Sequence, residues 1–308
     1  MKPYYNVIAH RSETRGSLLG LLGVLAFSLT LPATRAAVAD LDGTIVGLGR
    51  ALVAGALAAL LLAIRREPFP TRRQVRSLLV VALGVVVGFP LLSALALVSV
   101  PSSHGAIFVG LLPLSTAVMA VVRGGERPTP AFWAVAMVGL AIVVAFGISI
   151  GGGQLQSADL LLLGAIVAAG IGYAEGGRLA REMGGWRVVS WALVLAAPAL
   201  VVPVALAVGE HGLDAAAPAW LGFAYVSGVS MFLAFFVWFQ GLAEAGIARV
   251  GQLQLVQPIL TLGWAALLLG EQISTATLAA ALGVIVTVAV GRRTRVEPRR
   301  PSRNASRS

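Results

Sequence analysis

The chain has 308 residues, 58% of them apolar and 12% charged, with a mean hydropathy of +0.89. This composition argues against a soluble globular protein, because too little polar surface remains to cover one of this size. The absence of cysteine excludes disulfides, thiolate metal sites and cysteine catalysis. The net charge of +10 does not predict nucleic-acid binding, because the basic residues gather in the run 65–76 and after Gly291, without a basic face interleaved with aromatic residues.

Ten segments are apolar and long enough to cross a membrane as helices, which takes about 20 residues each. In chain order they are 17–35, 43–64, 77–98, 104–122, 131–150, 160–177, 188–208, 219–240, 248–269 and 273–291. The short linkers between several of them are typical of antiparallel neighbours in a helical bundle. The sequence therefore predicts an all-α integral membrane protein with ten transmembrane helices.

Charges in the linkers predict the orientation of this bundle. With the N-terminus in the cytoplasm, the inside segments hold 20 of the 23 basic residues. The outside segments have Arg35 as the one basic residue nearby and otherwise hold the acidic residues Asp40, Asp42, Asp159, Glu210, Asp214 and Glu271. Because lysine and arginine are enriched in cytoplasmic loops, we expect both termini in the cytoplasm and a multi-pass protein of the cell (plasma) membrane.

Two stretches repeat each other at an offset of 145 residues. Five positions recur, namely Pro113, Thr116, Ala120, Gly125 and Glu126 in the first copy and Pro258, Thr261, Ala265, Gly270 and Glu271 in the second. Five spans per half is an odd number, so the halves enter the membrane in opposite directions, as inverted repeats. We expect a cytoplasmic segment 1–16, a first five-helix repeat 17–150, a second 151–291 and a basic cytoplasmic tail 292–308.

The proline and Gly-Glu pattern, present once per half, resembles the EamA-type transporters of the drug/metabolite transporter superfamily. The resemblance covers about residues 16–291. It implies a helical bundle whose central cavity is lined mainly by spans 1, 3, 4, 6, 8 and 9, often in exporters of amino acids or other small metabolites. The first span departs from the family, because Phe27 and Arg35 stand roughly where many relatives carry a tryptophan-glycine step and a lysine.

Ionisable side chains inside a span are candidate functional residues, because each costs about 2.5–3.5 kcal/mol on insertion scales. Arg50 lies in the second span, where its guanidinium could bind a substrate carboxylate; the alternative is a structural ion pair with Asp40 or Asp42. Glu175 in the sixth span is a candidate for proton coupling. The alternative is a salt bridge with Arg178, which lies on the same helical face.

His104 and Arg249 also differ by 145, so they are equivalent positions of the two repeats. Inversion places His104 at the outer mouth of a central cavity and Arg249 at the inner mouth. We expect them to be gate or proton-coupling residues. The alternative is that both are ordinary span-end residues extending to the interface, with Arg249 beside Glu244.

The ninth span carries several glutamines before Pro258, and such amides cannot face lipid without losing hydrogen bonds. Gln254 and Gln257 share a face, and Pro258 frees the backbone carbonyl of Gln254. They predict a polar substrate site, with hydrogen bonds to spans 4 or 8 as the alternative. The substrate-binding candidates are Arg50, Gln254, Gln257, Ser115, Tyr173 and Trp238, and the expected helix breaks are Pro113 and Pro258.

These features predict a secondary active transporter that exports a small polar, amino-acid-like metabolite by alternating access. The chain has no GxxxxGK[ST] motif for ATP. We expect no cofactor, metal or nucleic acid, and the expected partners are a small-molecule substrate and the lipid bilayer. Transport is either coupled to protons or runs down a gradient, and a homodimer is left open. A passive channel or facilitator is the first alternative. A membrane enzyme is the second, although the three histidines are scattered and no intramembrane aspartate pair is present.

Overall fold

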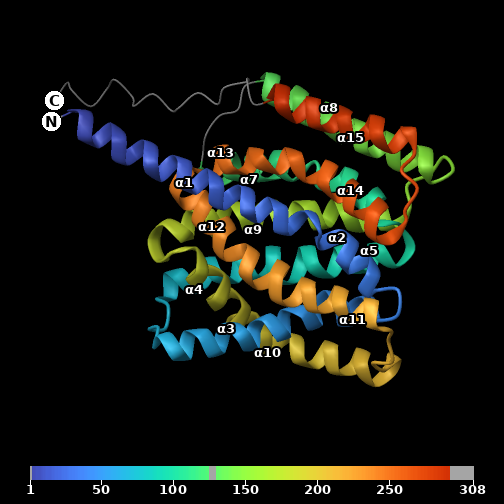
Figure 1. Ribbon diagram of the computed structural model, residues 1–308, viewed down its shortest axis with the longest axis horizontal. Coiled ribbons are helices and arrows are strands. Elements are labelled where there is room, and N and C mark those ends of the chain that lie inside the picture. The colour runs from blue at the N-terminus through green and yellow to red at the C-terminus, as the bar shows by residue number, and fades with distance from the viewer. Residues whose placement is uncertain (1, 125–129, 292–308) are drawn as a thin grey trace, which may run out of the picture.

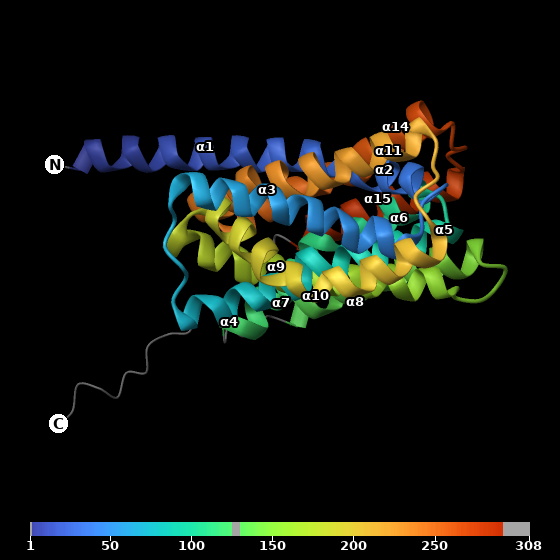
Figure 2. The same cartoon turned by 90° about the horizontal axis from the view of Figure 1, so that it is seen from below.

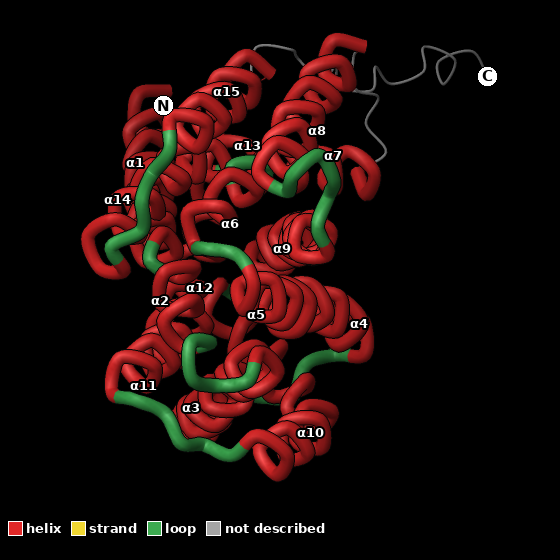
Figure 3. The backbone as a smooth tube through the Cα atoms, turned by 90° about the vertical axis from the view of Figure 1, so that its right-hand side faces the viewer, coloured by secondary structure: helices red, strands yellow, loops and turns green. Residues whose placement is uncertain are grey.

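The computed structural model describes residues 2–124 and 130–291, and every regular element in these residues is a helix (Figure 3). Gly125 and Glu126 of the first repeat copy, and the basic tail 292–308, lie outside the described residues. Nine helical stretches of the described part are long and apolar enough to cross a membrane. The position of the tenth expected span is taken by a shorter apolar helix.

The first half holds five helical stretches. The first, third and fourth are each divided into shorter helices, and the second begins with a π-helical turn. They are α1 (Lys2–Ser28) with α2 (Thr30–Ala37), the π-helical turn η1 (Ile45–Gly49) with α3 (Arg50–Arg65), α4 (Arg72–Val81) with the π-helical η2 (Ala82–Gly88) and α5 (Phe89–Ser99), α6 (Ser102–Val109) with α7 (Leu112–Gly124), and α8 (Pro130–Ile150). Helix α1 begins within the segment 1–16, which the sequence analysis had placed ahead of the first span. The first stretch breaks at Leu29 because Pro32 cannot donate to the carbonyl four residues earlier.

The second half also holds five stretches. They are α9 (Ser157–Met183), α10 (Gly185–His211), α11 (Ala217–Ala224) with the π-helical η3 (Tyr225–Leu233) and α12 (Ala234–Ala245), α13 (Ile247–Gly251) with the 3₁₀ turn η4 (Gln252–Val256) and α14 (Gln257–Leu269), and the short α15 (Thr275–Gly291).

The interruptions fall at matching places in the two halves. Helices α6 and α13 begin 145 residues apart, and so do α7 and α14, each of which starts one residue before a proline. The π-helical segments η2 and η3 also end 145 residues apart. Because π-helical turns are rare, two of them in equivalent positions indicate that the halves share one architecture. Such turns are also frequent at functional sites.

The helices run roughly along the long axis of the molecule, and α15 ends at the same end of the bundle at which α1 begins (Figure 1). Helix α1 projects beyond the other helices at this end (Figure 2). It is the basic end, where α3 ends at Arg65 and α10 begins beside Arg187. The opposite, acidic end holds Asp40, Asp42 and Glu271 in the linkers between helices.

Glycines allow the central helices to approach closely. A Cβ atom on Gly84 of η2 would lie 2.5 Å from the carbonyl oxygen of Ala168 on α9, and one on Gly241 of α12 would lie 2.8 Å from that of Gly16 on α1. Small residues at such crossings are typical of helix packing in membranes. These contacts hold α1 against α12 and α9 against the third stretch, the helices that surround the cavity described next.

Candidate functional site

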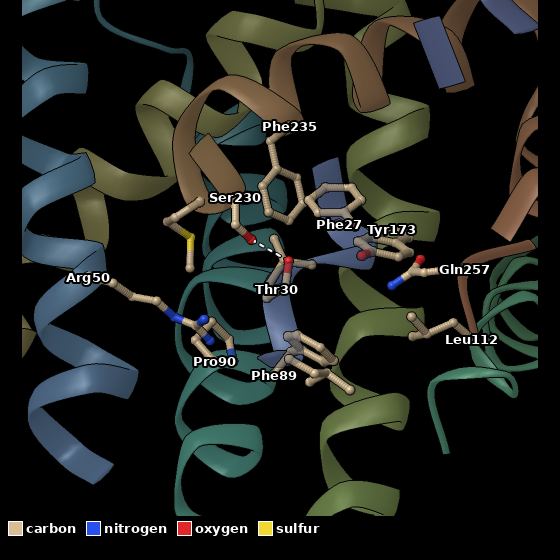
Figure 4. Close-up of a pocket in the computed structure, with 13 residues that line it drawn as sticks. Phe27, Thr30, Arg50, Phe89, Pro90, Leu112, Tyr173, Ser230, Phe235 and Gln257 are labelled. Atoms are coloured by element: carbon tan, nitrogen blue, oxygen red, sulfur yellow. Dashed lines mark hydrogen bonds between the residues drawn. The ribbon is translucent and has the colours of Figure 1, made fainter. Parts of the chain in front are cut away.

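A narrow cavity lies in the middle of the bundle, between the two halves (Figure 4). Its lining residues are Phe27, Thr30, Leu31, Arg50, Val85, Phe89, Pro90, Leu112, Tyr173, Ser230, Met231, Phe235 and Gln257. The cavity volume of about 20 Å³ is room for about one water molecule. The cavity is therefore too small, as it stands, to hold anything much larger than water.

Three pairs of lining residues are equivalent positions of the two halves. They are Val85 with Ser230, Pro90 with Phe235, and Leu112 with Gln257, each pair 145 residues apart. The cavity thus lies at the boundary between the halves. The second half supplies a hydroxyl and an amide where the first supplies apolar side chains, so the two walls differ chemically.

Arg50 is the charged residue of this cavity. It begins α3, its side chain extends toward Pro90 and Thr30 (Figure 4), and it is 1% exposed. Its Nη1 lies 3.5 Å from Thr34 Oγ1, whereas its Nε and Nη2 have no hydrogen-bond partner among the described residues. A buried cation without a counter-ion is costly unless a ligand or water compensates it.

The structural ion pair considered for Arg50 does not form. Asp40 Oδ2 accepts a hydrogen bond of 2.9 Å from the Ala216 amide. Asp42 Oδ1 accepts one of 2.7 Å from the Thr44 amide, at the start of the second stretch. Both aspartates are occupied in linkers at the acidic end, so neither neutralises the guanidinium.

Aromatic rings form one wall of the cavity. The ring centroid of Phe27 lies 4.9 Å from that of Phe235 and 6.4 Å from that of Tyr173. Trp238 contacts Phe27 and Tyr173 but is fully buried and does not line the cavity. Below these rings, Thr30 and Ser230 share a hydrogen bond of 2.8 Å that joins the first half to the second (Figure 4).

The polar candidates on spans 4 and 9 divide into two groups. Gln257 lines the cavity, and its Oε1 has no hydrogen-bond partner among the described residues. Gln254 lies outside the lining, fully buried, and its side chain interacts with Tyr173. Ser115 also lies outside it, because its hydroxyl donates to the Ile166 carbonyl of α9 at 3.0 Å. Of the six expected binding residues, Arg50, Tyr173 and Gln257 line the cavity.

At the acidic end, His104 forms a buried pair that the sequence analysis missed. Its Nε2 lies 2.6 Å from Asp159 Oδ1, with the two side chains 4% and 1% exposed. The imidazole also packs against Phe108 and Phe146. His104 therefore does not extend to the interface. Asp159, which the linker charges placed outside, lies buried in the first turn of α9.

Glu271, the marker carboxylate of the second repeat, binds the first repeat at this same end. Its carboxylate accepts hydrogen bonds of 2.8 Å from the Ser102 and Ser103 amides and from the Ser102 hydroxyl. These amides are the free donors at the start of α6. Glu271 therefore caps α6, a helix of the other half of the chain.

At the basic end, Arg249 Nη1 lies 2.7 Å from Glu13 Oε2 of α1, and both side chains are largely exposed. Its partner is thus not Glu244, the one suggested by the sequence. Glu175 Oε1 lies 2.6 Å from Arg178 Nη2, so the ion pair considered for this glutamate is present. The His104–Asp159 pair and the Glu13–Arg249 pair therefore join the first half to the second at opposite ends of the bundle.

Comparisons with known proteins agree with this architecture. The EamA-like transporter family profile matches residues 14–148 and again residues 156–291. The chain is 49% identical over 281 residues to the "uncharacterized transporter YdeK" of Bacillus subtilis (strain 168), covering 91% of this chain and 98% of that protein. A solved crystal structure, 20% identical, matches with a TM-score of 0.63 over 90% of this chain and 97% of its own, and so shares the fold.

Proposed function

Because the chain belongs to the EamA-like transporter family and is a multi-pass transporter of the plasma membrane, we propose that it exports a small polar metabolite bearing a carboxylate, such as an amino acid. Transport is secondary and active, and proceeds by alternating access to the central cavity. The relevant family is one of transporters, so enzymatic chemistry is not needed to account for the site.

The observation that carries the proposal is the unpaired guanidinium of Arg50 in the cavity. Arginine is always charged in proteins and forms strong paired hydrogen bonds to carboxylates. A carboxylate in the cavity would occupy Nε and Nη2 and remove the cost of the isolated charge. The Gln257 amide and the Ser230 hydroxyl, on the other side, suit the polar remainder of an amino-acid-like solute.

We place the basic end in the cytoplasm, with ten crossings, two inverted five-helix repeats and both termini inside. The charge difference between the ends supports this orientation, since basic residues concentrate on cytoplasmic loops. The matching interruptions of the two halves support the repeat, and α15 serves as the tenth crossing. Inverted repeats allow one half to take the shape of the other, which alternates access.

Contacts between the halves form the two gates. The outer gate consists of the His104–Asp159 pair and the Glu271 cap on α6, and the inner gate consists of the Glu13–Arg249 pair. Each must separate for its side to open. The outer pair is the proposed proton-coupling site, because it joins an imidazole to a carboxylate inside the bundle and opening would expose this buried pair to the outside.

Counterflow in proteoliposomes tests the function, with a pool of labelled amino acids and other small metabolites and with or without a pH gradient. We expect saturable exchange of one carboxylate-bearing class, abolished by Arg50→Leu and reduced by Gln257→Leu. Arg72→Gln, at the exposed start of α4 and outside both the cavity and the gates, serves as the control and should retain exchange of the same solutes. A saturable exchange of solutes that carry no carboxylate, surviving Arg50→Leu, would contradict the proposal.

A further inference from the structure

A second cavity opens near the basic end of the bundle and is much roomier than the central one. Its volume is about 490 Å³, and it lies between α1 and α3, over α12 and the start of α10. Two arginines line it, Arg15 from α1 and Arg65 from α3. None of the residues discussed for substrate binding or for the gates lines this groove.

The groove changes from charged to apolar along its length. Arg65 is the last residue of α3, whereas Leu61 lies one turn deeper on the same helix. Leu19 lies one turn deeper than Arg15 on α1, and Phe236 of α12 adds an aromatic surface. A site with cations at its mouth and apolar walls below fits an amphiphile. A purely polar solute would make no favourable contacts with the apolar side chains of those walls.

The positive charge of the groove is only partly compensated by neighbouring carboxylates, Glu244 near Arg15 and Glu67 near Arg65. Arg65 forms no salt bridge with the described residues, and Arg15 Nε lies 3.8 Å from Glu244 Oε2, at the limit of an ion pair. Glu67, the acidic residue nearest in sequence to Arg65, binds Arg187 through both carboxylate oxygens at 2.7 and 2.8 Å. These hydrogen bonds lower the pKa of Glu67, so it stays ionised and held by Arg187.

An aromatic side chain marks the depth of the groove in a membrane. Trp186, at the start of α10, lines the groove, and the Arg187 guanidinium lies 5.1 Å from its ring centroid. Tryptophan concentrates where the hydrocarbon meets the headgroups. The arginines would then lie at the level of lipid phosphates, and the leucines at the level of acyl chains.

We propose that this groove binds an anionic phospholipid of the cytoplasmic leaflet. Its phosphodiester lies between Arg15 and Arg65, and an acyl chain lies along Leu19, Leu61 and Phe236. Basic pockets between transmembrane helices on the cytoplasmic side bind such headgroups. The choice of leaflet rests on the orientation given under the proposed function; the binding itself does not depend on transport.

Lipid binding by the full-length purified protein tests the proposal. We would titrate phosphatidylglycerol into protein in detergent, following bound lipid by native mass spectrometry and thermal unfolding in parallel. Wild type should bind phosphatidylglycerol in preference to phosphatidylcholine, and Arg15→Gln/Arg65→Gln should weaken this binding roughly tenfold or more. Arg15→Lys/Arg65→Lys, which keeps both charges, should retain most of it.

The matched control is Arg72→Gln/Arg73→Gln, which removes two exposed arginines at the same end but outside the groove, and it should bind as wild type does. Inorganic phosphate and glycerol 3-phosphate should not stabilise the protein at concentrations where phosphatidylglycerol does. Equal binding by wild type and the groove variant would overturn the proposal, as would equal loss in the control. Stabilisation by phosphate alone would assign the groove to a soluble anion instead. Counterflow measures transport and the lipid titration measures binding to the groove. A negative result in one experiment therefore does not affect the interpretation of the other.

Discussion

Arg50 shows how one residue can be fixed by the fold and still lack a partner. It begins α3, and the nearby aspartates of the preceding linker are held by backbone amides at the acidic end. The cation therefore faces a cavity of aromatic, aliphatic and hydroxyl groups. A buried cation of this kind is expected to lower the stability of the protein when nothing is bound to it.

Replacing Arg50 by leucine should abolish exchange of the carboxylate substrate without lowering the unfolding temperature of the empty protein. A buried charge without a counter-ion contributes no favourable pairing that could be lost. Arg50→Lys should keep some exchange with a raised KM, because an ammonium cannot form the paired contacts of a guanidinium. Thermal unfolding in detergent and counterflow measure the two effects.

Arg35 provides the contrast for that experiment. Its Nη1 donates to the carbonyls of Leu97 and Val98 at 2.7 and 3.0 Å, near the end of α5. Arg35→Leu should therefore cost about 1–3 kcal/mol of stability and leave substrate preference unchanged. If Arg50→Leu destabilised the protein as Arg35→Leu is expected to, Arg50 would be a structural residue.

Sequence reasoning found the charged and amide candidates and the Glu175–Arg178 ion pair, but not the partners of His104 and Arg249. Arg50 and Gln257 were predicted as binding residues because polar groups in apolar spans are costly, a local property of the chain. Asp159 was read as a linker residue, since its pairing with His104 joins segments 55 residues apart. The 145-residue offset could have indicated this pairing. His104 is equivalent to Arg249, and Asp159 is equivalent to Thr14, the neighbour of the Glu13 that pairs with Arg249.

The close packing of helices at glycine can be tested by substituting the glycines. Gly84→Leu should destabilise the protein by about 1–3 kcal/mol or prevent its folding, because the new side chain would meet the α9 backbone. The matched control is Gly263→Leu on α14, where nothing lies within 4 Å of a Cβ atom. Thermal unfolding and folded yield measure both. Equal tolerance of the two substitutions would show that η2 and α9 are not packed as described.

The Glu271 cap predicts how the outer gate responds to mutation. Glu271→Gln should open this gate more often, because the free amides of α6 prefer an anionic acceptor. The chain has no cysteine, so Ser103→Cys introduces a single thiol at a position buried in the closed state. Labelling of this thiol in cells by an impermeant maleimide should be faster in the Glu271→Gln background.

Asp214→Asn is the control for this labelling, since Asp214 is exposed in the linker before α11 at the same end. It should leave the rate as it is in the Ser103→Cys parent. Unchanged labelling in the Glu271 variant, or equal acceleration in both, would show that the cap does not hold the gate. The marker carboxylate of the family pattern would then serve only the local helix end.

The positions of the helices can be predicted from apolar runs in the sequence. The places where these helices are interrupted can be predicted only in part. The nine long stretches match the first nine predicted spans, because span length depends on composition alone. Prolines explain the breaks at the starts of α7 and α14. The π-helical segments η2 and η3 carry no comparable local signal, because they depend on how neighbouring helices pack.

For the whole molecule, the central inference is that two related halves enclose an anion site between them. Equivalent residues of the halves line the cavity, and the His104–Asp159 and Glu13–Arg249 pairs join one half to the other at opposite ends of the bundle. As it stands, the cavity is too small to hold anything much larger than water. Movement of one half against the other would widen it on one side at a time.

Counterflow of one acid and its primary amide tests this claim most directly. The acid is the solute best exchanged from the pool, and the amide has nearly the same size and shape but no charge. The account predicts that wild type exchanges the acid at least about tenfold faster than the amide, and that Arg50→Leu removes this difference. Equal exchange of acid and amide by wild type, or an acid preference that survives in Arg50→Leu, would contradict it.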